Sequence, residues 1–262
     1  MRMRNIWACC CLGMLLLTFA GTLRAEDENS FHAAASVDYF SRYVWRGQNL
    51  NNDGVFQFNA EGKAWGFTGA IWSNMPLTDA QGTRSAGEFD EIDYSLDFSR
   101  SISKFNDKAS YSLGVIHYTL GGYDTPTTEI YGKLSFNVPL SPSVAWYRDV
   151  DTIDGSYLEF GLGHTFEKIV KWSDDKYIDI DLSAVFGLGG SGYNAGYFGW
   201  EKTKFNDLTL NVAVPFNLKH GISITPSFHV SAMLDGDIRS TYAYGTGDST
   251  NVWFGIKFSK SF

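Results

Sequence analysis

Apolar and polar residues alternate along most of the chain beyond residue 30. The pattern is clearest at the end of the chain, where Val252, Phe254, Ile256 and Phe258 are apolar and the residues between them are polar or small. A period of two predicts a β-strand whose faces meet different environments. The chain ends on Phe262. A strand left unpaired at that point would expose an edge prone to aggregation, so we expect it to close a barrel against the first strand.

Twelve segments show this alternation. They are residues 35–46, 55–63, 66–74, 91–99, 109–119, 129–138, 143–150, 156–166, 177–187, 207–215, 221–232 and 250–262. A tilted strand of about 9–11 residues spans the hydrocarbon core of a membrane. Single-chain bacterial barrels have an even number of strands. The pattern therefore predicts an all-β fold, a closed antiparallel transmembrane β-barrel of about 12 strands, preceded by an N-terminal signal peptide.

The connections between the predicted strands alternate in length. Long ones (76–88, 188–204 and 233–249) are rich in Gly, Asp, Ser and Thr, whereas 64–65 and 139–142 are short. Long outer loops and short periplasmic turns are expected when both termini lie in the periplasm. No helical periodicity of useful length is found after the signal peptide.

A soluble antiparallel barrel or sandwich is the alternative, because its strands also alternate, with the apolar face pointing inward. Aromatic residues near the predicted strand ends favour a membrane barrel, whose two interfaces carry girdles of such side chains. These residues are Tyr43, Trp45, Trp65, Trp146 and Trp253.

The N-terminus has the order of a secretory signal peptide. Arg2 and Arg4 precede an apolar run over residues 6–20, and small and polar residues follow to Ala25. We expect cleavage after Ala25, which leaves one outer-membrane barrel domain over residues 26–262. The three cysteines, at 9–11, lie in the signal peptide. The mature chain would then have neither disulfides nor thiolate metal ligands.

Charge and composition narrow the class further. The net charge is −8, and loss of the signal peptide, which carries three arginines, makes the mature chain more acidic. An acidic protein lacks the electrostatic footprint of nucleic-acid binding. Aromatic residues are 16% of the chain, yet the mean hydropathy is −0.16. Membrane barrels combine these features because each strand exposes only half its residues to lipid.

Three stretches resemble a known family. Residues 39–50 read Tyr-Phe-Ser-Arg-Tyr-Val-Trp-Arg-Gly-Gln-Asn-Leu, residues 66–74 read Gly-Phe-Thr-Gly-Ala-Ile-Trp-Ser-Asn, and residues 154–162 read Asp-Gly-Ser-Tyr-Leu-Glu-Phe-Gly-Leu. The first is similar to the opening strand of the TorF-type porins, a bacterial outer-membrane family, and the others match later parts of the same pattern. The resemblance implies an outer-membrane barrel and a channel, and it brings no established substrate and no catalytic residues.

Charged residues gather on one face of the predicted strands. A Lys or Arg facing lipid at mid-bilayer costs about 2–4 kcal/mol, so this face must line the lumen. The candidates for setting selectivity are Asp38, Arg42, Arg46, Glu61, Lys63, Glu91, Asp93, Asp97, Glu129, Lys133, Glu159, Asp179, Asp181 and Lys257, with Asp207 on the same face. A net-acidic lumen favours cations. The alternative is that opposite charges neutralise one another and fill the barrel structurally.

Arg42 and Arg46 lie four residues apart on the first predicted strand, so both side chains point the same way. They could form a basic ladder opposite the acids and create a transverse field. Alternatively, they pair with Glu61 or Asp93 on neighbouring strands.

Two further patterns are weak evidence for a ligand site, one for a dinucleotide and one for Ca²⁺. Residues 187–192 match the dinucleotide fingerprint spacing, but that site needs a helix start directly afterwards, and residues 193–197 predict none. The acidic pairs at 179/181 and 235/237 offer oxygen ligands for Ca²⁺ without the spacing of a calcium loop. We expect no cofactor and no metal.

His229 lies between Ser227 and Ser231 on one strand face. Outer-membrane phospholipases place a His and a Ser on the barrel wall for nucleophilic catalysis. Same-face neighbours are unavoidable on a strand, however, and the sequence identifies no orienting carboxylate. We therefore expect no enzyme activity, and lipid hydrolysis is the third hypothesis.

The leading hypothesis is a passive channel in the bacterial outer membrane for small polar or ionic solutes, with a modest cation preference. Expected partners are outer-membrane lipid, the solutes, and the barrel assembly machinery that reads the strand ending in Phe262; nucleic acid is not expected. The second hypothesis is a structural or ligand-binding barrel that acts through its extracellular loops. The aromatic loop 188–204 would bind the partner through Tyr193, Tyr197, Phe198 and Trp200.

Overall fold

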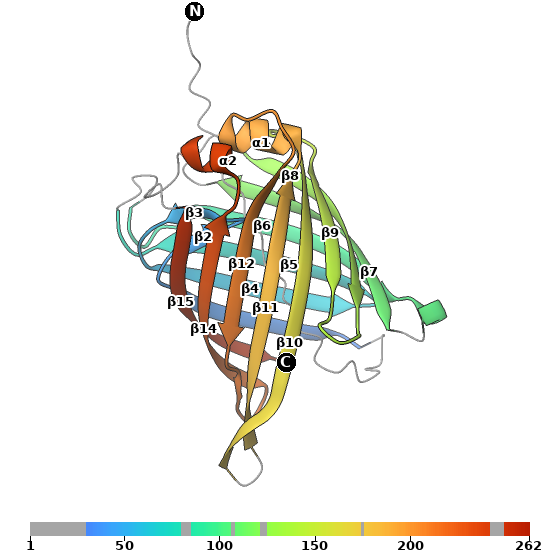
Figure 1. The fold of residues 1–262 in the computed structure, drawn as a ribbon. Helices are drawn as coiled ribbons and strands as arrows, with labels where there is room; N and C mark the ends of the chain where they lie inside the picture. The colour runs from blue at the N-terminus through green and yellow to red at the C-terminus, as the bar shows by residue number, and fades with distance from the viewer. Residues whose placement is uncertain (1–29, 80–84, 106–107, 121–124, 174–175, 242–248) are drawn as a thin grey trace, which may run out of the picture.

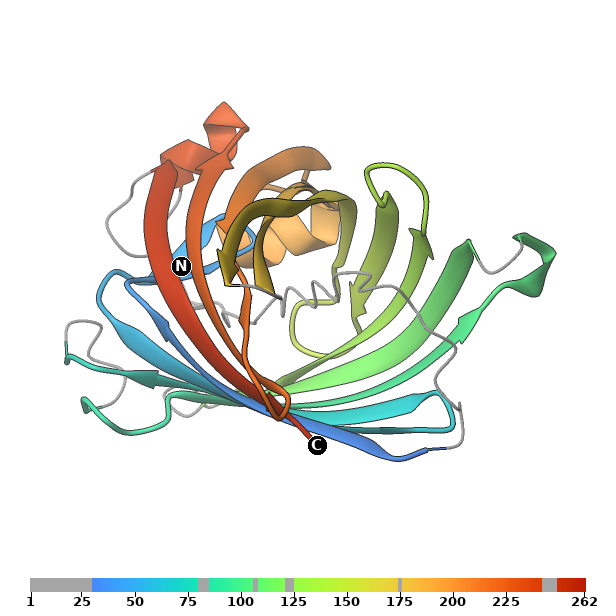
Figure 2. The same ribbon diagram turned by 90° about the horizontal axis from the view of Figure 1, so that it is seen from below.

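The computed structural model describes residues 30–79, 85–105, 108–120, 125–173, 176–241 and 249–262. Twelve long antiparallel strands follow one another around a closed barrel (Figures 1 and 2). They are β1 (His32–Phe40), β4 (Val55–Ala64), β5 (Phe67–Pro76), β6 (Glu91–Ser101), β7 (Ala109–Leu120), β8 (Thr127–Phe136), β9 (Ser143–Asp149), β10 (Ser156–Ser173), β11 (Lys176–Gly189), β12 (Lys204–Ala213), β14 (Ile222–Met233) and β15 (Thr250–Ser261). The predicted closed antiparallel barrel of twelve strands is confirmed, whereas the predicted signal peptide and its cleavage after Ala25 lie outside the described residues.

Pairing between the first and last long strands closes the barrel. In the β1–β15 register, Val37 lies opposite Phe258 and Asp38 opposite Lys257. Residues that face each other across a ladder share a face of the sheet. Apolar pairs therefore stack on one side of the wall and charged pairs on the other, where Lys257 Nζ lies 3.6 Å from Asp38 Oδ2.

The apolar side of the wall faces outward. Large exposed apolar side chains occur on eleven of the twelve long strands; examples are Val37, Ile71, Leu96, Leu113, Ile130, Trp146, Leu162, Leu182, Leu210, Phe228, Val252 and Phe254. A soluble barrel would turn this face inward, so the structure rules out the soluble alternative. An outward apolar band is what a hydrocarbon environment requires of a barrel.

The two ends of the barrel differ. Short connections at one end join β4 to β5 and β8 to β9, and we call this the turn end; the opposite end is the loop end. The loop end carries a small hairpin of β2 (Tyr43–Trp45) and β3 (Gln48–Asn51) and the helices α1 (Ser191–Phe198) and α2 (Gly236–Thr241) (Figure 1). A two-residue strand β13 (Phe216–Asn217) and a 3₁₀ turn (Ser103–Phe105) lie in turn-end connections. Within the described ranges, the helices are too short or too polar to cross a bilayer.

The first predicted strand is too long by six residues. It ends at Phe40 rather than at residue 46, and the chain then turns back into the barrel as β2 and β3. Tyr43 and Trp45 are consequently buried, and Trp253 also lies inside, so their assignment to an aromatic girdle was wrong. Trp65 and Trp146 are exposed, as a girdle requires.

Two other elements differ from the sequence prediction. Strand β10 runs to Ser173, and its pairing with β11 becomes irregular after Phe166, where the hairpin extends beyond the turn end (Figure 1). Helix α1 occupies a segment in which no helix was predicted. Tyr193, Tyr197 and Phe198 of α1 are buried, so tertiary packing rather than local propensity accounts for the helix.

Candidate functional site: an acidic lumen with an inserted hairpin

The β2–β3 hairpin turns on two residues, Arg46 and Gly47. Both have positive φ values, 42° and 80°, as a two-residue type I′ turn requires. The turn lies against the barrel wall, because a Cβ on Gly47 would be 2.4 Å from Met233 Sδ and 2.6 Å from Asp207 Cβ. Only glycine fits this position, so the tip of the hairpin is closely packed against β12 and β14.

The rest of the hairpin contacts other parts of the wall. Tyr43 Oη donates a hydrogen bond to Glu91 on β6 at 2.9 Å. Burial and then the charge of Glu91 hold the pKa of Tyr43 well above its ordinary value, so the phenol remains a donor. Asn251 Nδ2 on β15 donates to the Gly47 carbonyl at 3.2 Å, and the ring of Trp45 lies 5.4 Å from that of Tyr197 on α1. The hairpin thus reaches across the loop end of the barrel.

A bidentate ion pair joins the tip to the opposite wall. Arg46 Nη1 and Nη2 donate to Glu129 Oε1 and Oε2 on β8 at 2.8 and 2.9 Å. Tyr118 Oη donates to Glu129 Oε2 at 2.9 Å. The Arg46 and Glu129 side chains are 3% and 2% exposed, so the pair is fully desolvated. Breaking such a pair from one side leaves a buried, uncompensated charge.

Aromatic rings surround the same guanidinium. Arg46 Cζ lies 4.6 Å from the ring centroid of Trp45, 4.6 Å from Tyr147, 4.3 Å from Tyr157 and 5.6 Å from Tyr193. These distances suit cation–π attraction, which strengthens when the cation is desolvated. We call these four rings, together with Glu129, the Arg46 cage.

Carboxyl groups lie near the cage on the strands from β6 to β12. We call them the acidic ring: Glu91, Asp93, Glu129, Asp149, Glu159 and Asp207, each within the first or last four residues of its strand at the loop end. Asp149 accepts Thr127 Oγ1 at 2.7 Å, and Asp207 accepts Tyr157 Oη at 2.5 Å. Asp93 differs from these. It is 3% exposed, and neither of its oxygens accepts a hydrogen bond from the residues that the structure describes.

Charges are more mixed toward the turn end. Tyr131 Oη donates to Asp97 at 2.8 Å, and Lys63 and Lys133 interact electrostatically with the same carboxylate. Asp181 accepts Thr165 Oγ1 at 2.7 Å. Lys133 also interacts with Glu159, so this half of the lumen is closer to neutral than the acidic ring.

The remaining predicted lumen residues are placed as follows. Glu61 lies on the same face of β4 as Gln57, Arg42 lies in the bend between β1 and β2, and Asp179 Oδ1 accepts the Lys168 backbone N–H at 2.7 Å beside the irregular part of β10. The selectivity role assigned to all fourteen candidates stays a prediction.

The predicted basic ladder of Arg42 and Arg46 is wrong, because the two residues do not share a strand. Arg46 pairs with Glu129 rather than with Glu61 or Asp93. The signal for the hairpin was present in the sequence. Gly47 follows Arg46 directly, and Gly54 precedes the second long strand. A Gly at the second turn position between short strand-like runs predicts a two-residue hairpin.

The glycine-rich run at 187–192 has a packing role. A Cβ on Gly187 would meet Tyr157 Oη at 1.8 Å, and one on Gly189 would meet Asn194 Oδ1 at 2.3 Å. A helix does follow this run, contrary to prediction. The space over these two glycines is nevertheless filled by the protein's own side chains.

The acidic pair at 235 and 237 caps a helix. Asp235 Oδ1 accepts the backbone N–H groups of Asp237 and Ile238 at 2.9 and 3.2 Å, and Lys204 Nζ donates to its other oxygen at 2.8 Å. The Lys204 hydrogen bond lowers the pKa of Asp235. Among the residues described, no group of three or more His, Cys, Asp or Glu is placed to hold a metal.

His229 on β14 is the centre of a polar chain. Its Nδ1 lies 2.5 Å from Asn211 Oδ1 on β12, and its Nε2 lies 2.8 Å from Ser227 Oγ. Asn211 Nδ2 donates to Ser183 Oγ at 3.0 Å, which fixes the orientation of the amide. Because an amide oxygen only accepts, His229 Nδ1 donates to it, and Nε2 accepts the Ser227 hydroxyl proton. The sequence contained no carboxylate at this place, and Asn211 supplies the orienting group instead.

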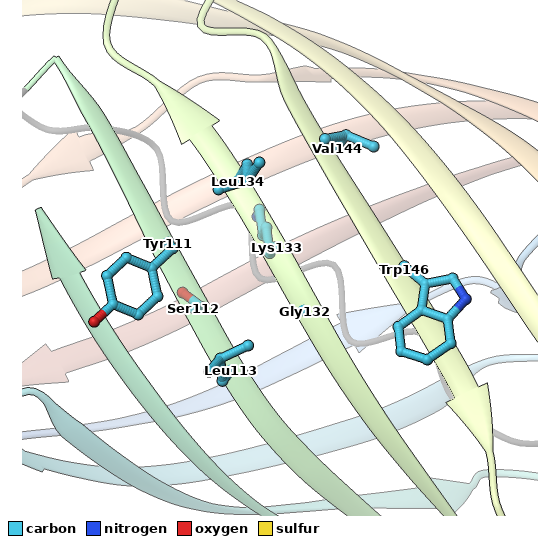
Figure 3. Close-up of a pocket in the computed structure, with 8 residues that line it drawn as sticks. All are labelled: Tyr111, Ser112, Leu113, Gly132, Lys133, Leu134, Val144 and Trp146. Atoms are coloured by element: carbon cyan, nitrogen blue, oxygen red, sulfur yellow. The ribbon is translucent and has the colours of Figure 1, made fainter. Parts of the chain in front are cut away.

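A depression of about 330 Å³ lies over β7, β8 and β9 (Figure 3). It is lined by Tyr111, Ser112, Leu113, Gly132, Lys133, Leu134, Val144 and Trp146. The apolar members lie on the outward faces of these strands, and Gly132 leaves the space between them. The depression faces the hydrocarbon side of the wall, so it is not part of the lumen.

The fold and the site together define a class: a closed antiparallel barrel with an apolar exterior and a charged, hydrogen-bonded interior. Two similar solved structures are a "KdgM porin" and a "KdgM porin in complex with disordered oligogalacturonate". Each is 13% identical with a TM-score of 0.51; the matches cover 87% and 88% of this chain and 99% of each porin. At this identity the likeness shows the barrel fold. No family model and no curated protein matches the chain, so the TorF-type resemblance stays a prediction.

Proposed function

We propose that the protein is an outer-membrane channel through which small polar solutes diffuse, with a modest preference for cations. The observation that carries this proposal is the acidic ring, in which six carboxyl groups lie at the loop end of the strands from β6 to β12 and one of them, Glu129, pairs with the inserted guanidinium of Arg46. Fixed charges of one sign in a narrow, low-dielectric passage raise the local concentration of counter-ions. The apolar exterior supports insertion in lipid, and the strand ending in Phe262 is the segment that the barrel assembly machinery would read.

The charge of the ring also narrows the solute class. The similar porin structure holds oligogalacturonate, a polymer of acidic sugars. A ring of carboxylates repels a polyanion, so solutes of this chain are neutral or cationic.

Conductance of the purified protein in planar bilayers tests the proposal. We expect discrete steps and a reversal potential of the cation-selective sign in a KCl gradient. Absence of steps, or the opposite sign, contradicts it.

The loop hypothesis loses its main support. Tyr193, Tyr197 and Phe198 point into the barrel and are buried, and Trp200 is partly buried against the same cluster, so these rings do not form an exposed surface for a partner.

A second candidate function, ester hydrolysis, rests on the chain Ser227–His229–Asn211. This arrangement reproduces the roles of a nucleophile, a base and an orienting group. A fluorophosphonate probe that labels the wild-type protein and not Ser227→Ala would support it. Absence of labelling in the folded wild type would leave the channel as the proposed function.

A further inference from the structure

The Arg46 cage and the neighbouring Asp93 contain more buried carboxyl groups than the single guanidinium of Arg46 can pair with. Asp93 interacts electrostatically with Glu129 of the cage and with Tyr43 of the β2–β3 hairpin. Its carboxyl group therefore lies close to both the cage and the hairpin. Glu159 and Asp207 also interact electrostatically with Arg46. One guanidinium thus serves several buried carboxyl groups, and the ionised form of any of them is strongly unfavourable unless a cation lies beside it.

The geometry of these groups selects the kind of cation that could complete them. Metal ions are not favoured, because the described residues contain no grouping with metal-ligand geometry. Three tyrosine rings from the wall and α1 (Tyr147, Tyr157 and Tyr193) instead offer their faces to a cation. Aromatic faces and carboxylates together are the recognition chemistry of guanidinium and organic ammonium groups.

We propose that the Arg46 cage, extended by Asp93, is a binding site for small organic cations of the guanidinium or ammonium type, and that Arg46 occupies it as a tethered internal competitor. The proposal rests on the proposed channel function and names the solute class that the loop-end mouth recognises. An arriving cation displaces Arg46 from Glu129 and uses Asp93 as its second anchor. Displacement of Arg46 also breaks the ion pair between the β2–β3 hairpin and β8, while Gly47 stays packed against β12 and β14.

Agmatine, which carries a guanidinium and an ammonium group on one chain, is the probe. Its binding to the full-length protein, purified from membranes in detergent, is measured by titration calorimetry. We expect Arg46→Ala to bind agmatine at least tenfold more tightly than the wild type, because the internal competitor is gone. We expect Asp93→Asn to bind at least tenfold more weakly than the wild type. A neutral urea analogue of agmatine should bind to none of them.

Two further variants serve as controls. Asp53→Asn makes the same chemical change in the β3–β4 connection, where Asp53 accepts Thr78 Oγ1, and it should bind agmatine as the wild type does. Arg46→Lys keeps an internal cation, so it should bind agmatine more weakly than Arg46→Ala does. If the alanine variant does not fold, Arg46→Lys replaces it in the comparison with Asp93→Asn. Equal affinities for agmatine in the wild type, Arg46→Ala and Asp93→Asn would overturn the proposal.

Bilayer conductance separates this proposal from the channel itself. Conductance steps without agmatine binding overturn the cation site and leave the channel. Agmatine binding with the expected variant pattern, but without conductance, overturns the channel and leaves the site.

Discussion

Arg46 is the residue on which the interior depends most. Its guanidinium is desolvated, bonded through both terminal nitrogens to Glu129 and surrounded by four aromatic rings. It also adopts a positive φ, which residues with a Cβ atom reach only at a cost in conformational energy. The network of contacts around the side chain holds this backbone conformation in place.

Removing either member of the Arg46–Glu129 pair should destabilise the barrel by different amounts. Arg46→Ala leaves Glu129 among other carboxylates with no cation, whereas Glu129→Gln leaves Arg46 near Glu159 and Asp207, which still attract it. We expect a loss of about 3–5 kcal/mol for Arg46→Ala and a smaller loss for Glu129→Gln. Urea unfolding in lipid vesicles, followed by tryptophan fluorescence, measures both. A larger loss for Glu129→Gln would show that the acidic ring is not in charge excess.

A second prediction at this scale concerns Gly47. Gly47→Ala introduces a Cβ at a φ of 80° and within 2.6 Å of both Met233 Sδ and Asp207 Cβ. We expect a loss of about 1–3 kcal/mol in the same unfolding assay, because strain and a steric clash add. Gly69→Ala on β5 is the matched control, since a Cβ there meets no atom within 4 Å. Equal stability of the two variants would mean that the hairpin tip is not held against the wall.

Sequence reasoning succeeded for residues inside long strands and failed for those that leave them. Glu91, Asp93 and Glu129 were placed on the inner face by alternation alone, because a strand has a strict period of two. Arg46 was correctly predicted to face the interior, but it was placed on the first long strand, whereas it lies in the turn of the inserted β2–β3 hairpin. Its true partner, Glu129, is 83 positions away along the chain, and local pattern holds no information on such a contact.

Among the elements, the β2–β3 hairpin bears most directly on the proposed channel. It contacts β6, β8, β12, β14, β15 and helix α1, so it spans the loop-end mouth of the barrel. Phe40 and Val55, at either end of the segment that contains it, are paired across β1 and β4. A short turn can therefore replace the segment without disturbing the wall.

Deletion of the hairpin should enlarge the channel. We expect replacement of residues 43–51 by a short Gly-Ser linker to raise the single-channel conductance several-fold while the barrel stays folded. Planar-bilayer recording gives the conductance, and the shift in electrophoretic mobility on heating reports folding. Unchanged conductance in a folded variant would show that the hairpin does not restrict the passage.

The two helices show why elements in loops were harder to predict than strands. Helix α1 has eight residues, too few to be stable alone, and it is held by Tyr193, Tyr197 and Phe198 packing into the barrel. The spacing of Tyr193, Tyr197 and Phe198 fits one face of a helix, but a segment this short, with two glycines among its eight residues, gives no clear helical signal in the sequence. Only the closed barrel creates the interior surface against which these rings pack.

For the molecule as a whole, the alternating pattern predicted the architecture correctly. Closure of β1 on β15 follows from the need to pair every strand edge in lipid. The alternation of connection lengths follows from the length of the strands and their even number. The filling of the mouth by the chain's own hairpin could not be predicted in the same way. It depends on which side chains meet across the barrel, and that is set by the three-dimensional closure.

Along each long strand, polar residues are expected to face a hydrated interior while their apolar neighbours face hydrocarbon. Cysteine substitution at four successive positions of β6 (Tyr94, Ser95, Leu96 and Asp97) tests it, because the native cysteines all lie at residues 9–11. The protein is placed in lipid vesicles and treated with a charged, membrane-impermeant thiol reagent. We expect rapid labelling at positions 95 and 97 and protection at 94 and 96. Labelling at 94 and 96 as fast as at 95 and 97, or the reverse pattern, would contradict the account.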